Sequence, residues 1–213
     1  MNHTTTLKEN LRQEKYQAIL TDLSLDPNRI DYQTTRYIKA IECYETAFGA
    51  GGVSIYSAPG RSEIGGNHTD HQHGEVLAAS INNDAIAVVS PLDEPVVKVI
   101  SDSYELITID LGNLSLQESE KGSTRALIKG GLVSAQERGY RIGGLQTYIT
   151  SDVLIGAGLS SSAAFETIIG TILSGLYNEM KISPIEIAMM GQYAENVYFG
   201  KPCGLMDQMA CSV

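Results

Sequence analysis

The chain has 213 residues, of which 43% are hydrophobic, and a formal net charge of −10 at pH 7. That length is enough for one large domain or two small ones with a buried core. The negative charge argues against nucleic acid or an anionic membrane as a partner. A basic-then-apolar signal sequence is absent, and no apolar run is long enough to span a membrane, so we predict a cytoplasmic protein. Its three cysteines are not spaced as a metal site and are expected to be reduced thiols.

Two helices are expected in the first 50 residues, because hydrophobic residues recur at helical spacing over residues 7–23 and 37–48. Val53–Ala58 alternates like a short strand, whereas Gly74 to Ser80 begins like a helix. Further strand-like runs lie at residues 85–90, 96–101 and 104–111. Only Asp102-Ser103 separates the last two, which predicts a hairpin.

The second half of the chain alternates helices with a strand. Helices are predicted at residues 123–138, 159–177 and 184–197, and a strand at residues 145–150. Interleaved strands and helices, together with the hairpin, predict an α+β (mixed α/β) fold with a mixed β-sheet and helices packed against it.

The most informative stretch is Leu154–Glu166, which reads LIGAGLSSSAAFE. Gly156 and Gly158 permit a tight turn that approaches a ligand closely, three consecutive serines follow, and an apolar helical run comes next. The first turn of a helix adds unpaired N–H donors and a favourable dipole, so this stretch predicts a phosphate-binding loop. The competing interpretation is a Gly/Ser loop that only caps a helix.

A second stretch, residues 58–74, is unusually polar and follows a predicted strand. Its mixed donors and acceptors suit a sugar or another polyol. Two alternatives are a solvated loop and a metal site, the latter because the stretch holds four potential ligands: His68, Asp70, His71 and His73.

A third stretch, residues 194–208, contains two carboxylates 12 positions apart, Glu195 and Asp207. Asp207 stands among apolar residues, where a carboxylate must be paired, ligated or shifted in pKa. The competing interpretations are an exposed helix residue for Glu195 and a helix cap for Asp207.

These three motifs, in this order, resemble the galactokinases within the wider family of GHMP small-molecule kinases. Ala58–Asp70 resembles the sugar-site signature, Gly156–Ala164 the ATP-phosphate motif, and Cys203–Gln208 the segment that carries the catalytic aspartate. The resemblance covers roughly residues 50–213.

The resemblance implies ATP-dependent phosphorylation of galactose at the C1 hydroxyl. Asp207 would accept the hydroxyl proton, and Arg61 would orient Asp207 and offset phosphoryl charge. Ser162 and Glu195 would hold Mg²⁺. The expected sugar-binding residues are Asn67, His68, Thr69 and Asp70. The expected ATP-binding residues are Gly156, Ala157, Gly158, Leu159, Ser160, Ser161, Ser162 and Ala163.

Residues 51–213 would then form the N-terminal kinase domain, with residues 1–50 a helical extension packed on it and the C-terminal domain missing from this chain. This piece alone is expected to be inactive, and its oligomeric state is left open. The chain departs from the family pattern in three ways: Asn67 replaces a Glu that meets the C6 hydroxyl, Glu63-Ile64-Gly65 replaces the usual triplet, and Leu154 replaces a common Pro. Two alternatives therefore stay open, a family kinase for another sugar and a non-catalytic sensor of sugar and ATP.

Overall fold

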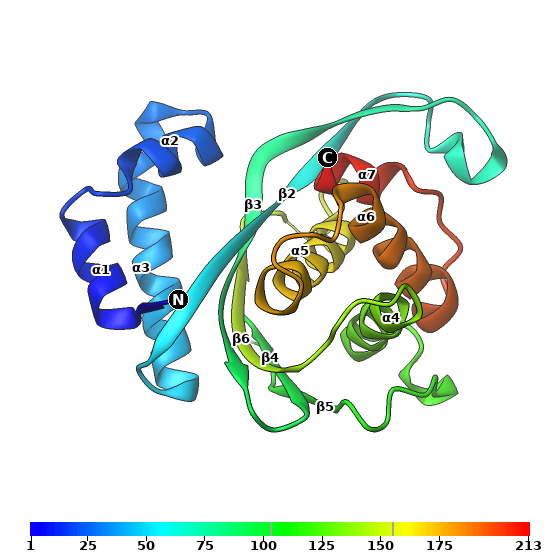
Figure 1. The fold of residues 1–213 in the computed structure, drawn as a ribbon. Coiled ribbons are helices and arrows are strands. Elements are labelled where there is room, and N and C mark those ends of the chain that lie inside the picture. Colours follow the sequence, from blue (N-terminus) through cyan, green and yellow to red (C-terminus); the bar gives the residue numbers. More distant parts are fainter. Residues whose placement is uncertain (103, 155) are drawn as a thin grey trace.

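The computed structural model describes residues 1–102, 104–154 and 156–213, and it has a central β-sheet covered by helices on both faces (Figure 1). The strands are β1 (Asn2–His3), β2 (Gly52–Gly65), β3 (Leu77–Leu92), β4 (Val96–Ser101), β5 (Ile107–Asp110) and β6 (Gly144–Ser151). The helices are α1 (Thr4–Arg12), α2 (Gln17–Ser24), α3 (Ile30–Phe48), α4 (Thr124–Glu137), α5 (Ser161–Tyr177), α6 (Pro184–Tyr193) and α7 (Met206–Ser212). Within these residues, no helix combines the length and the apolar character that crossing a membrane requires.

The sheet is mixed, as the sequence predicts. Its strand order is β1-β2-β3-β6-β4-β5, and β4 runs parallel to β6 while the other neighbouring pairs described are antiparallel. β4 and β5 form the antiparallel pair expected of the hairpin, although Ser103 of its turn lies outside the described residues. The α+β prediction is therefore confirmed.

Two hydrophobic cores lie on opposite faces of the sheet, and β3 contributes to both. Ile86 and Val88 point to the helical layer of α1, α2 and α3, where they join Ile41 and Tyr44. Ala85, Ala87 and Val89 alternate with them along β3 and belong to the core on the other face, which α4, α5 and α6 cover (Figure 1). Because side chains alternate along a strand, a strand covered on both faces is apolar throughout, and residues 85–89 are all apolar and buried.

Three local predictions differ from the structure. The helix expected over residues 7–23 is broken into α1 and α2, with Glu14 in the left-handed region between them. The helical start at residues 74–80 is wrong: β3 begins at Leu77, because Ala78, Ala79 and Ser80 pair with the end of β2. The helix expected at 184–197 continues beyond α6 as a π-helical segment, Ala194–Phe199.

Candidate active site

The end of β2 and the loop between β6 and α5 are packed backbone against backbone. The Arg61 N–H donates to the carbonyl oxygen of Leu159 at 3.2 Å. A Cβ at Gly60 would lie 2.9 Å from that same oxygen and 2.8 Å from a methyl group of Val153, so only glycine permits this approach. The polar stretch 58–74 and the predicted phosphate loop are thereby joined.

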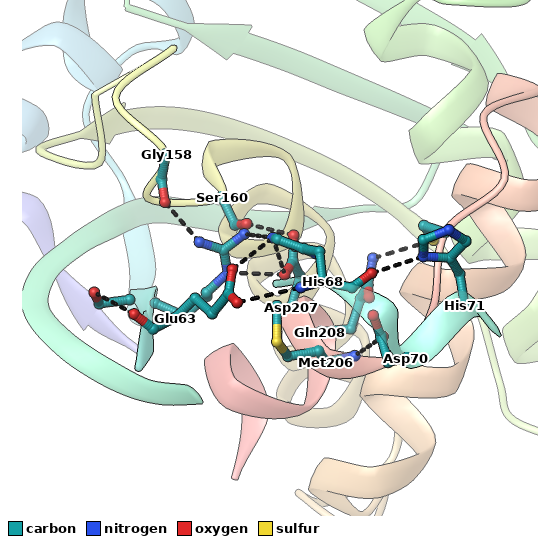
Figure 2. Close-up of polar contacts among 12 residues, drawn as sticks. Glu63, His68, Asp70, His71, Gly158, Ser160, Met206, Asp207 and Gln208 are labelled. Atoms are coloured by element: carbon teal, nitrogen blue, oxygen red, sulfur yellow. Dashed lines mark hydrogen bonds and ion pairs between the residues drawn. The ribbon is translucent and has the colours of Figure 1, made fainter. Parts of the chain in front are cut away.

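The Arg61 guanidinium is the centre of the site, and only 5% of the residue is exposed. Its Nε donates to Asp207 Oδ1 at 2.8 Å, and one terminal nitrogen donates to the carbonyl oxygen of Gly158 at 2.6 Å. The other terminal nitrogen lies 2.6 Å from His68 Nε2 (Figure 2). Because a guanidinium only donates, His68 must accept through an unprotonated Nε2 and carry its proton on Nδ1. Arg61 therefore links all three sequence motifs.

Asp207 lies in the first turn of α7, and both of its carboxylate oxygens are held. Oδ1 accepts from Arg61, and Oδ2 accepts from the Ser160 hydroxyl at 2.5 Å. Burial alone would raise the pKa of Asp207, but the hydrogen bonds from Arg61 and Ser160 and the positive charge of Arg61 lower it below its ordinary value. The interpretation of Asp207 as a helix cap is wrong, because the capping position is Leu205. Asp207 is ionised at neutral pH and has a fixed orientation.

In the predicted phosphate loop, Gly158 has a φ of +73°, and its carbonyl oxygen accepts from Arg61. Ser160 is the N-cap residue of α5, but within the described residues its side chain makes no capping bond. Its hydroxyl is directed at Asp207 instead. The first N–H groups of α5, which begin at Ser161, are thus not capped by that side chain, and unpaired donors at a helix N-terminus attract anions.

The loop after β2 is held by hydrogen bonds between its own residues. Asn67 and His68 both have left-handed backbones (φ 53° and 55°), a conformation that Asn and His adopt more readily than most residues. The His68 N–H donates to Glu63 Oε1 at 3.2 Å, and the Thr69 hydroxyl donates to the carbonyl oxygen of Gly66 at 2.8 Å. Asn67 is exposed. Of the four predicted sugar-binding residues, Thr69 thus uses its hydroxyl in a hydrogen bond within this loop.

Asp70 ties this loop to the start of α7, because its Oδ2 accepts from the Met206 N–H at 2.9 Å. A cavity of about 210 Å³ opens beside that contact. Its lining residues are His68, Asp70, His71, Glu195, Lys201, Pro202, Cys203, Gly204, Asp207 and Gln208. The cavity thus brings three residues of the polar stretch 58–74 together with both carboxylates of the third motif.

Glu195 is 4% exposed and lies in the π-helical segment, so its interpretation as an exposed helix residue is wrong. The buried Glu166 of α5 is close enough to repel it. Two buried carboxylates close to each other give oxygen donors and negative charge, which fit a hard divalent cation. Among the residues described, no group of three or more His, Cys, Asp or Glu side chains could hold a metal, so a site built on His68, Asp70, His71 and His73 finds no support.

Sequence reasoning missed Glu166 and Gln208 as parts of this site. Glu166 is a charged residue within the apolar run of α5, and that contrast was a signal available in the sequence. Burial and repulsion from Glu195 raise its pKa well above the ordinary value of 4.5.

We expect Glu166→Gln to stabilise the protein at neutral and alkaline pH. A carboxyl whose pKa is raised in the folded state contributes stability below the unfolded pKa, and this stability is lost as pH rises towards the folded value. The neutral amide removes that loss, so the gain in melting temperature should grow above about pH 4.5. Each kcal/mol gained would raise Tm by about 2–4 °C. Thermal unfolding without metal from pH 4 to 8 measures this, with the exposed Glu9→Gln as a matched control. A gain that is the same at every pH would contradict it.

Two family models match the chain. The galactokinase galactose-binding signature matches residues 42–91, and the GHMP kinases N terminal domain matches residues 126–213. Among solved structures, a Lactococcus lactis galactokinase complexed with galactose superposes with a TM-score of 0.73 at 29% identity, over 79% of this chain and 44% of that one. A Methanococcus jannaschii mevalonate kinase shares the fold at a TM-score of 0.64 and 18% identity, over 76% of this chain and 51% of that one. The fold and site thus define the N-terminal domain of a GHMP kinase.

Two curated relatives show to which family of GHMP kinases the chain belongs. A galactokinase from Pyrococcus furiosus is 40% identical over 72% of this chain and 42% of its own length. A galactokinase from Streptomyces coelicolor is 33% identical over 79% of this chain and 43% of its own length. The chain belongs to the galactokinase family, and it spans less than half the length of these relatives.

Proposed function

We propose that this chain carries the sugar- and phosphate-binding half of a kinase that transfers a phosphoryl group from ATP to the C1 hydroxyl of galactose, giving galactose 1-phosphate. The observation that carries the proposal is the network around Arg61. One buried side chain contacts the sugar loop at His68, the phosphate loop at Gly158, and the carboxylate of Asp207. Arg61 would therefore hold the phosphate-binding loop, the sugar-binding loop and the proton-accepting carboxylate in fixed positions relative to one another.

Asp207 would accept the proton of the C1 hydroxyl as that oxygen attacks phosphorus. Its low pKa makes it a weak base, which suits a loose transition state in which alignment and charge matter more than basicity. Arg61 would hold Asp207 in orientation and offset the charge of the moving phosphoryl group.

ATP would bind with its phosphates at the loop of residues 156–160 and the first turn of α5, where the resemblance places Ser161, Ser162 and Ala163. Ser162 and Glu195 would hold Mg²⁺, which supplies charge neutralisation on the phosphate oxygens when bound. The domain division at residue 50 belongs to the same proposal. It is supported by the separate hydrophobic core that α1, α2 and α3 form with one face of the sheet.

A second candidate is a family kinase for another sugar, and the exposed Asn67 favours it. A coupled assay of the full-length protein with ATP and a panel of sugars tests both candidates. Galactose turnover at the highest kcat/KM supports the first, and a clear preference for another sugar supports the second. ATP and sugar binding without turnover would instead indicate the sensor.

The charge at position 67 gives a specificity prediction. Asn67→Glu should bind galactose more tightly than Asn67→Gln by on the order of 1 kcal/mol, because charge-assisted hydrogen bonds are about twice as strong as neutral ones. Both variants have side chains of the same length on the same left-handed backbone, so their difference isolates the charge. With 6-deoxygalactose the difference should vanish. Calorimetric titration of both proteins with both sugars measures it, and equal galactose affinities would show that position 67 does not meet the C6 hydroxyl.

A further inference from the structure

Gln208 follows Asp207 on α7, yet it contacts a different part of the site. It is 1% exposed, and its Nε2 donates to Glu166 Oε2 at 3.1 Å and to Glu195 Oε2 at 3.4 Å. The same nitrogen lies 3.8 Å from the sulfur of Cys203. One amide group therefore stands between two buried carboxylates that come from different helical elements.

The two negative carboxylates determine how the Gln208 amide is oriented. An amide nitrogen has two hydrogens, and here each has a carboxylate to meet, so the amide is oriented with its nitrogen towards both. The reverse orientation would place its oxygen against two negative groups. Glu166 Oε1 and Gln208 Oε1 are buried and lack a hydrogen-bond partner among the described residues. The Gln208 Nε2 is thus a hydrogen-bond donor that Glu166 and Glu195 share.

We propose that Gln208 is a positioning residue that fixes the Glu195 carboxylate for a divalent cation by holding it against the repulsion of Glu166. This inference rests on the role of Glu195 under the proposed function. Gln208 uses only Oε2 of Glu195. It thereby connects the helix of the proton-accepting Asp207, the helix that follows the phosphate loop, and the π-helical segment that carries Glu195.

The test replaces Gln208 with Met in the full-length protein, which keeps a similar side-chain volume and removes the amide. Residues that orient a metal ligand typically contribute 10–100-fold to metal affinity. We therefore expect Mn²⁺ binding in the presence of ADP, followed by electron paramagnetic resonance, to weaken about 10–100-fold. The Mg²⁺ concentration for half-maximal rate should rise in parallel, while calorimetric galactose affinity stays unchanged.

Gln192→Met is the matched control, because Gln192 bonds to the carbonyl oxygen of Cys203 rather than to a carboxylate. It should leave Mn²⁺ affinity unchanged. Adding Glu166→Gln to Gln208→Met removes the repulsion and should restore much of the Mn²⁺ affinity, a rescue that a merely structural role would not produce.

Unchanged Mn²⁺ affinity in folded Gln208→Met, or loss without rescue in the double variant, would overturn the inference. If Gln208→Met does not fold, Gln208→Asn keeps an amide that is one methylene too short to reach both carboxylates, and the same outcomes apply. The Mn²⁺ measurement needs no sugar. A protein that binds Mn²⁺–ADP as expected but does not phosphorylate galactose would contradict the proposed function and leave the role of Gln208 intact.

Discussion

Asp207→Asn should lower the rate of galactose phosphorylation by about 10²–10⁴-fold, the usual cost of losing a group that accepts a proton in the transition state. The amide should fit the same place. Its oxygen can accept from Arg61, and its nitrogen can donate to Ser160, since a hydroxyl can both donate and accept. Galactose and ATP affinities should therefore stay close to those of the unaltered protein.

Steady-state kinetics together with separate titrations of sugar and nucleotide measure the effect. Asp22→Asn is the matched control, because Asp22 is an exposed aspartate on α2 and should leave turnover unchanged. A near-normal rate in folded Asp207→Asn protein would remove Asp207 from the chemistry. A loss confined to KM would instead assign it to sugar binding.

How much of the site the sequence could predict depends on the range of each interaction. The Arg61–Asp207 contact joins residues 146 positions apart, and no spacing or periodicity pointed to it. Only the resemblance placed these two residues together, and the structure brings them to 2.8 Å. Their roles in the reaction stay predictions.

Local patterns were reliable where packing agreed with them and misleading where it did not. The serine-rich helix start is local, and α5 begins at Ser161, near the expected residue 159. Residues 74–80 begin like a helix when considered alone, but pairing with β2 makes a strand from Leu77. Glu195 had the pattern of an exposed residue, but it is buried, with its carboxylate beside Gln208 of α7 and close to Glu166 of α5. Tertiary contacts decided both cases.

Arg61→Lys should lower kcat by at least about 10²-fold, although the charge is kept. The guanidinium makes three contacts in three directions, to Asp207, Gly158 and His68, and an ammonium on a flexible stem cannot reproduce that planar geometry. Misplacing a catalytic group by about 1 Å can cost about 10²-fold. The loss should appear in kcat more than in galactose affinity, because Arg61 holds the proton acceptor rather than the sugar alone.

Arg61→Gln extends the test to pH. Only ionised Asp207 can accept the proton, and in the native site the contacts of Arg61 and Ser160 keep its pKa below the ordinary value of 3.8. When the guanidinium is removed, burial remains and raises the pKa. The acid limb of the kcat/KM profile should therefore move to higher pH in Arg61→Gln, whereas in Arg61→Lys, which retains a positive charge, it should move less. An acid limb at the same pH in all three proteins would show that Arg61 does not control the ionisation of Asp207.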